Sequence, residues 1–248
     1  MNYKHPPITE AVIEIRLSEE ISDSDKNKIW RDFIDEYPLE DMVIAAKDVE
    51  IKIDGNADNA TTSAQIEKGL RRSSTNADEV ILLWKNSFIV SQLAPYPGWE
   101  TFIGRFEQGW SIWKKTAGYK NISRIGIRYI NRIDIPSSDI EQPISRYLSI
   151  FPNIPETLGS SAHYAIQTQI PLAQDNLTLT ISSSLLPTTM APLLNHKSYI
   201  MDIDIGKETN PPQNDKAILE LLNNIREIKN QCFESCITQQ ARDLFNHD

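Results

Sequence analysis

Cysteine is scarce in this chain, whose 248 residues include only two, Cys232 and Cys236. So few cysteines exclude a framework of disulfide bonds. The first residues carry no apolar stretch of the kind found in a secretory signal, so we expect a cytoplasmic location. No apolar run approaches the roughly 20 residues that a membrane-spanning helix needs, and we therefore expect no membrane association.

Glycine is scarce as well, with 9 glycines against 14 prolines. The chain contains no Gly-x-x-x-x-Gly-Lys-Ser/Thr, Gly-x-Gly-x-x-Gly, His-Glu-x-x-His or Gly-x-Ser-x-Gly pattern. These patterns hold phosphates, dinucleotides, zinc and a nucleophilic serine, respectively. The sequence therefore gives no indication that the protein belongs to the main nucleotide-cofactor or hydrolase classes. It predicts no cofactor and no catalytic residue.

Positive charge is in deficit, with 25 Lys and Arg against 34 Asp and Glu and a net charge of −9. A chain of this charge matches the phosphate backbone poorly, so nucleic acid is not expected as a partner. The charge is unevenly spread: residues 18–58 hold 13 acids and 5 bases, and residues 99–134 hold 7 bases and 3 acids. These two regions can attract each other or attract separate partners.

Hydropathy patterns predict an α+β fold in which both halves of the chain have the same order of elements. The first half has a strand at 11–17, a helix capped by Ser22 or Ser24 and closed by Pro38, strands near 42–53, 61–70, 79–84 and 87–93, and a helix at 99–117. The second half has a strand at 122–135, a short helix at 140–150, strands near 161–171, 176–185 and 197–205, and a long helix at 215–245.

An offset of 114 residues aligns the two halves and sets Ile13 on Ile127 and Pro38 on Pro152. We therefore expect two pseudo-repeated βαβββα units, residues 1–118 and 119–248, in one compact globule. Each unit should form a mainly antiparallel sheet covered by helices on one face. The interface between the halves is the first place to seek a ligand.

Five stretches of the sequence resemble a known family: residues 6–11, 96–102, 124–133, 201–204 and 241–245. Together they resemble a family of sporadically distributed bacterial proteins of about this length, and the stretch from Arg124 to Ile133 is the most specific. The resemblance covers essentially the whole chain. It implies an accessory gene of the kind that travels with mobile or defence loci. It implies no activity and no catalytic residue, because the family has none assigned.

A row of arginines on the strand at 122–135 is the first candidate site. The strand period of two places Arg124, Arg128 and Arg132 on one face, at steps of about 13 Å. Guanidinium groups on a rigid strand suit a carboxylate, a phosphate or an acidic partner segment. Alternatively, the offset relates Arg124 and Arg128 to Glu10 and Glu14, and these rows would pair if the two strands are neighbours. Arg132 has no acidic counterpart, so we expect it to be the freest of the three.

Three further residues are candidate ligand contacts. Trp99 follows Tyr96-Pro97-Gly98 and opens an aromatic helix, where it either anchors the helix to its sheet or helps form a stacking surface for bases or peptides. Tyr129 is a second candidate for stacking. Asn131 is polar on an otherwise apolar strand face, so it either bonds to buried backbone or contacts a ligand.

Two pairs of residues have the spacing of metal ligands. Asp202 and Asp204 lie on one face of a strand, about 6.5 Å apart along it. They either hold Mg²⁺ together with a phosphate substrate or form ion pairs with the arginine row. Cys232 and Cys236 lie one helical turn apart, but zinc needs two further ligands and no histidine has suitable spacing, so we expect them to pack in the core.

The charge asymmetry without a catalytic pattern favours a non-enzymatic protein-interaction module of an accessory or defence-type locus. Its protein partner can be encoded nearby, and a homo-oligomer is compatible with the same features. The alternative is a small-molecule or nucleotide-phosphate enzyme that uses the arginine row and the aspartate pair between the halves. Single-stranded nucleic-acid binding along the basic face is a third hypothesis.

Overall fold

The computed structural model describes residues 3–53, 60–136, 143–159, 161, 163–186, 193 and 196–246. The strands are β1 (Ile8–Leu17), β2 (Leu39–Ile53), β3 (Ala60–Ser73), β4 (Glu79–Leu83), β5 (Ser87–Leu93), β6 (Ile122–Pro136), β7 (Tyr164–Leu172), β8 (Leu177–Leu185) and β9 (His196–Lys207). The helices are α1 (Asp23–Asp32), α2 (Trp99–Ala117), α3 (Asp215–Cys236) and α4 (Gln239–Leu244). Each predicted strand is present close to its expected bounds, and α2 begins and ends at the predicted residues.

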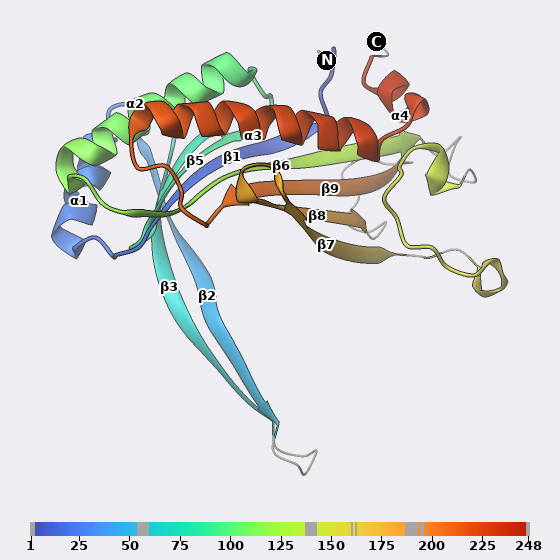
Figure 1. The fold of residues 1–248 in the computed structure, drawn as a ribbon, viewed down its shortest axis with the longest axis horizontal. Coiled ribbons are helices and arrows are strands. Elements are labelled where there is room, and N and C mark those ends of the chain that lie inside the picture. The colour runs from blue at the N-terminus through green and yellow to red at the C-terminus, as the bar shows by residue number, and fades with distance from the viewer. Residues whose placement is uncertain are drawn as a thin grey trace.

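The nine strands form one antiparallel sheet in the order β2-β3-β4-β5-β1-β6-β9-β8-β7 (Figure 1). Strands β1 and β6 pair in the middle of this order, with Ile13 directly opposite Ile127. The sheets expected for the two halves are therefore one continuous sheet, and the boundary predicted at residue 118 lies on the connection from α2 to β6.

The long helices α2 and α3 lie on one face of the sheet (Figure 1). Helix α2 packs on β5 and on α1, and α3 packs on β6 and β9. On β1 the residues Ala11, Ile13, Ile15 and Leu17 are buried, whereas Val12, Glu14 and Arg16 alternate with them and are not. The side of the sheet that carries the latter residues is called the open face below, because no helix covers it in the part of the chain that the structure describes.

The predicted N-terminal cap of the first helix is confirmed. The side chain of Ser22 accepts a hydrogen bond from the backbone N–H of Asp25, as an N-cap serine does. The helix ends earlier than predicted, at Asp32, and a turn carries the chain to Pro38.

The predicted short helix at 140–150 is wrong in its described part. Residues 144–146 form only a 3₁₀ turn, and Leu148 then forms an antiparallel bridge with Ile237. The remainder of the prediction, residues 140–142, lies outside the described residues.

The predicted single C-terminal helix at 215–245 is two helices. Ile237 has extended backbone between α3 and α4, and this conformation allows it to pair with Leu148. Thr238 then caps α4 by accepting a hydrogen bond from the N–H of Ala241. Buried apolar residues continue on both sides of the break, so periodicity alone does not reveal it.

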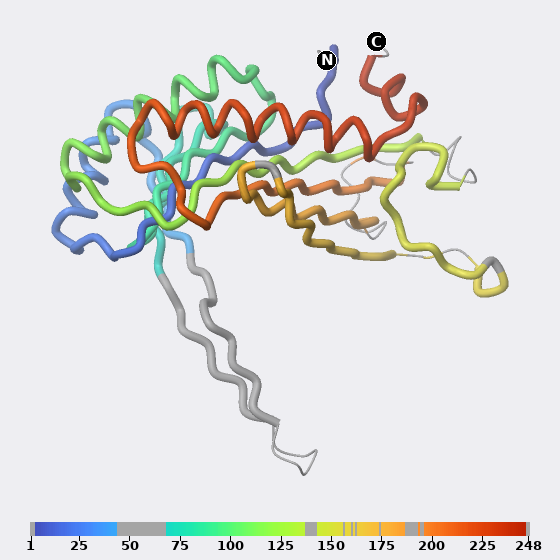
Figure 2. The backbone as a smooth tube through the Cα atoms, viewed as in Figure 1, coloured from blue at the N-terminus to red at the C-terminus, as the bar shows by residue number. Residues whose placement is uncertain are grey.

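The two ends of the described chain lie close together (Figure 2). The backbone N–H of His5 donates to the carbonyl of Phe245, 2.9 Å away, and the ring of Tyr3 packs edge-on against that of Phe245. Among the described helices, none combines the length and the apolar character that crossing a membrane requires.

Candidate functional site

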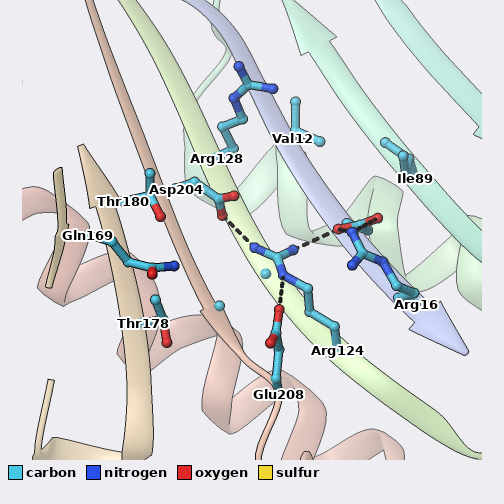
Figure 3. Close-up of a pocket in the computed structure, with 13 residues that line it drawn as sticks. Val12, Arg16, Ile89, Arg124, Arg128, Gln169, Thr178, Thr180, Asp204 and Glu208 are labelled. Carbon is cyan, nitrogen blue, oxygen red and sulfur yellow. Dashed lines mark hydrogen bonds and ion pairs between the residues drawn. The ribbon is translucent and has the colours of Figure 1, made fainter. Parts of the chain in front are cut away.

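Arg124 lies flat on the open face of the sheet (Figure 3). Its Nη1 is 2.6 Å from the Glu14 carboxylate, and its Nη2 is 2.7 Å from that of Asp204. Gly126 and Gly206 are opposite each other on β6 and β9, beneath the guanidinium, and a Cβ on either would come closer than 3.0 Å to it. The two glycines therefore create the space for this arginine, whose side chain is only 12% exposed.

The other two arginines of the row are paired as well. Arg128 forms a bidentate pair with Asp202, with the closest atoms 2.5 Å apart. The Nε of Arg132 donates to Asp134 at 2.9 Å. The expectation that Arg132 is the freest of the three is therefore wrong, because Asp134, two positions along the same strand and on the same face, pairs with it.

The predicted pairing between the arginine row and the glutamates of the neighbouring strand is partly confirmed. Arg124 pairs with Glu14, because β1 and β6 are adjacent. Glu10 instead accepts a hydrogen bond from Ser91 of β5 at 2.6 Å. Arg128 finds its partner on β9, on the opposite side of β6 from the glutamates.

The two aspartates form ion pairs with the arginine row, which is one of the two alternatives left open by the sequence. Asp202 and Asp204 lie on the open face of β9, and each carboxylate pairs with one arginine. No group of three or more potential metal ligands occurs among the described residues. The two carboxylates are thus each held by a guanidinium group of β6.

A hollow of about 420 Å³ lies on the open face around Arg124. Three arginines line it, and so do three carboxylates: Arg16, Arg124, Arg128, Glu14, Asp204 and Glu208. Its remaining lining includes the Thr178 and Thr180 hydroxyl groups of β8 (Figure 3). Because the charges balance, this surface offers little net attraction for an anion.

A second cavity, the α3 pocket, has a volume of about 450 Å³ and lies on the helix side of the sheet. Its walls are the N-terminal segment up to Ile8, the loop 96–99 before α2, the β6 residues Tyr129 and Asn131, and α3. The first two walls come from the first half of the chain and the last two from the second half. The pocket thus lies between the two halves of the chain, which is where the sequence analysis expects a ligand first.

Lys229 is the most unusual residue of the α3 pocket. Its side chain is buried, with the residue 8% exposed, and its Nζ lies 3.8 Å from the centroid of the Tyr129 ring. Burial, and then the positive charge of Arg226, lower the pKa of Lys229 to about 8. Buried lysines are almost always paired with an acid, yet this ammonium contacts an aromatic face instead.

Aromatic rings form the wall beside Lys229. The hydroxyl groups of Tyr129 and Tyr96 are 2.8 Å apart and share a hydrogen bond, and burial raises the pKa of Tyr129. Trp99 is buried and its Nε1 donates to Asn223 of α3 at 2.8 Å. Trp99 therefore connects α2 to α3, a contact that neither sequence interpretation included, and it also lines the pocket.

Asn131 and Arg226 are two further polar residues of the pocket. Asn131 is buried, and its Nδ2 donates to the backbone carbonyl of Met201 at 3.2 Å. It thus bonds to buried backbone and also lines the cavity. Arg226 lies with its guanidinium 5.7 Å from the centroid of the Trp99 ring, at the pocket wall.

The structure therefore divides the predicted site residues between two faces of the sheet. The alternation along β6 places Arg124, Arg128 and Arg132 on the open face, whereas Trp99, Tyr129 and Asn131 meet in the α3 pocket. Sequence reasoning missed Lys229. A signal was present, because Lys229 occupies a position in the buried stripe of α3 that is otherwise apolar, made of Ile218, Leu222, Ile225, Phe233 and Cys236.

The two cysteines are free thiols, with Cys236 buried and Cys232 partly buried on α3. This agrees with the expectation that they pack in the core. No protein-family model matches the chain, and no curated protein matches it significantly, so the geometry carries the functional interpretation.

Proposed function

We propose that this protein binds a small anionic molecule with a flat apolar part in the α3 pocket. The observation that carries the proposal is Lys229, a buried ammonium that faces the pocket and contacts an aromatic ring rather than an acid. A carboxylate or phosphate placed there would form the ion pair that no described residue forms with Lys229.

The charge of the pocket supports this class of ligand. Lys229 lines it together with one acid, Glu234, whereas Arg226 of the pocket wall forms an ion pair with Glu227 at 2.7 Å. That acid is already engaged, because it accepts hydrogen bonds from Tyr3 at 2.5 Å and from Arg242 at 2.8 Å. Among the described residues Lys229 forms no ion pair, so its charge is available to an anion in the pocket, in contrast to the paired arginines of the open face.

The shape of the lining supports the apolar part of the ligand. Tyr96, Trp99 and Tyr129 present ring surface beside the cation, and such rings bind flat groups by stacking. The cavity of about 450 Å³ falls in the range of small-molecule sites. A nucleotide phosphate is one ligand with this chemistry, and it would bind in the α3 pocket rather than at the arginine row.

Titration with phenyl phosphate and with benzoate, monitored by calorimetry and by tryptophan fluorescence, tests the proposal. We expect saturable binding that perturbs Trp99 fluorescence and that Lys229→Met abolishes. Lys216→Met, on the same helix but with an exposed side chain, is the matched control and should bind as the wild type does. Binding that is equal in all three proteins, or that is undetectable for both probes, would overturn the proposal.

A second candidate is the protein-interaction module of an accessory or defence-type locus, which the family resemblance suggests. One observation favours it: Ile34, Leu39 and Met42 are large apolar residues that are 49%, 46% and 54% exposed. Eight exposed carboxylates accompany them in the described part of the acidic region: Glu19, Glu20, Asp23, Asp32, Asp35, Glu36, Glu40 and Asp41. Residues 34–42, called the patch below, thus expose apolar side chains among acidic ones, and such a segment suits a basic partner surface.

Affinity purification from the native host tests this second candidate. A partner encoded nearby should be recovered with the wild type and lost with Ile34→Ser/Met42→Ser. The control is Tyr119→Ser, a similar change at an exposed residue outside the patch. Recovery of the same protein with every variant would contradict docking at this patch.

We further propose that the two halves arose by duplication. In the first half, β1 lies beside β5, and β4, β3 and β2 follow towards the edge of the sheet. In the second half, β6 lies beside β9, and β8 and β7 follow towards the opposite edge. Ile13 and Ile127, which the offset of 114 residues aligns, are paired at the centre of the sheet. A local two-fold relation between the halves would produce that coincidence.

A further inference from the structure

Strand β7 ends the sheet, and in the described part of the chain its outer edge is unpaired. All of its nine residues, Tyr164–Leu172, pair with β8 on one side. Within the described chain, no strand pairs with its other side. The strand contains no charged residue, and it is unbroken by a bulge in its pairing with β8. Exposed edges in soluble proteins are normally blunted by charge, bulges or proline, because a bare edge is a template for another strand.

The only blunting residue in β7 is Pro171, which lies next to the end of the strand. Proline lacks an N–H and so cannot donate to a new neighbour. It leaves the central residues 165–170 with their backbone groups intact. Most of β7 is exposed, including Ile170 at 39%. This edge is therefore able to accept a further strand.

The sequence of β7 identifies the strand that fits this edge. Residues 166–170 read Ile-Gln-Thr-Gln-Ile, which is the same in both directions about Thr168. If two copies of β7 pair antiparallel about Thr168, then Ile166 faces Ile170 of the second copy and Gln167 faces Gln169. Tyr164 would face Leu172 in the same register. Apolar residues thus meet apolar residues, and amides meet amides.

Such a match is what a two-fold axis requires, because each residue must be compatible with its symmetry mate. The absence of charge matters for the same reason, since each copy carries a net charge of −9 and like charges opposite each other across strands are destabilising. A foreign strand would place no such requirement on the sequence of β7. The palindrome therefore favours a second copy of this chain over an unrelated partner.

We propose that β7 pairs antiparallel with β7 of a second copy, with the two-fold axis at Thr168. The two nine-stranded sheets then form one continuous sheet, and the covered edge no longer needs protection. This dimer is independent of ligand binding in the α3 pocket, whose walls do not include β7.

Disulfide trapping tests the register. Thr168 would face its own copy at a Cα separation of about 4.5–5.5 Å, within the range that a disulfide bridges. Under oxidising conditions Thr168→Cys should therefore give a covalent dimer. Gln167→Cys is the matched control, because residue 167 would lie more than about 7 Å from its own copy and would not cross-link efficiently. Equal cross-linking of the two variants, or of wild type with its native cysteines, would overturn the proposed register.

Charge exchange tests the interface without a covalent bond. One variant carries Gln167→Lys and Gln169→Lys, and the other carries Gln167→Glu and Gln169→Glu. Each alone places like charges opposite each other and should sediment as a monomer of 28.3 kDa. Their mixture should restore a species of twice that mass. Far-UV circular dichroism and thermal midpoints close to those of wild type establish that both variants fold.

Three results would overturn the dimer. The first is a wild type that remains monomeric from micromolar to millimolar concentration. The second is that both charge variants still form homodimers. The third is that a mixture of the two folded variants remains monomeric.

Discussion

Gly126 of β6 lies directly opposite Gly206 of β9, and the guanidinium of Arg124 occupies the space that two Cβ atoms would otherwise fill. The pair explains how a strand residue can lie flat on its own sheet. It also explains why the arginine row is not a free anion site. The guanidinium is held within the sheet by Glu14 and Asp204, and although burial alone would lower the pKa of Arg124, these carboxylates raise it.

Gly126→Ala should destabilise the protein by about 1–3 kcal/mol, because the new Cβ displaces the guanidinium and leaves Glu14 and Asp204 without their partner. Thermal or urea unfolding measures the loss. The control is Gly104→Ala, since Gly104 lies within α2 with open space around it. That change should stabilise by about 0.5–1 kcal/mol through helix propensity. Equal effects of the two substitutions would refute the role given to the glycine pair.

Arg72→Met should destabilise the protein by about 2–4 kcal/mol. Arg72 is buried, and it donates to the carbonyls of Trp30 at 2.9 Å and Tyr37 at 3.2 Å, so its removal leaves both acceptors buried without a donor. Chemical denaturation measures the change. Arg71→Met, one residue away and only partly buried, should cost far less. A small effect at Arg72 would show that water replaces its hydrogen bonds.

Lys229 should make stability depend on pH in a window between its two pKa values. In the folded protein the pKa is about 8, and the ordinary value is 10.5. Between these values the unfolded chain binds more protons, so stability rises with pH there. Burial of the charged Lys229 lowers the free energy of unfolding by its full amount below pH 8, and this loss of stability disappears as the pH rises towards 10.5.

The measurement is the unfolding free energy of wild type minus that of Lys229→Met, taken at several pH values by urea titration. The subtraction removes the other groups that ionise in this range. We expect the difference to increase by roughly 3 kcal/mol in favour of wild type across the window. A difference that does not change with pH would show that Lys229 keeps its ordinary pKa.

Much of the fold could be predicted because local patterns determine it. The alternation in β6 separates Arg124, Arg128 and Arg132 from the buried Ile125, Ile127 and Tyr129 as expected. The aromatic stripe of α2 also predicted its bounds. What failed depends on contacts between distant segments. The break at Ile237 follows from its bridge to Leu148, and no periodicity in α3 reports that contact.

The candidate site was predictable only in part for the same reason. Trp99, Tyr129 and Asn131 stood out as aromatic or polar residues in unusual positions, and they meet in the α3 pocket. Lys229 was not recognised, because a lysine on a helix is normally solvated at its charged end. Only the packing of α3 against β6 shows that this lysine lies over Tyr129.

The most direct test of the central claim is the affinity of the protein for phenyl phosphate at pH 7 and at pH 9.5, measured by calorimetry for wild type and for Lys229→Arg. The probe is a dianion at both pH values, whereas Lys229 with a pKa of about 8 loses its proton between them. We expect the affinity of the wild type to fall by about 30-fold, whereas the permanently charged arginine variant should keep its affinity. An affinity of wild type that does not change with pH, or an equal loss in both proteins, would contradict the assignment of Lys229 as the anion-binding group.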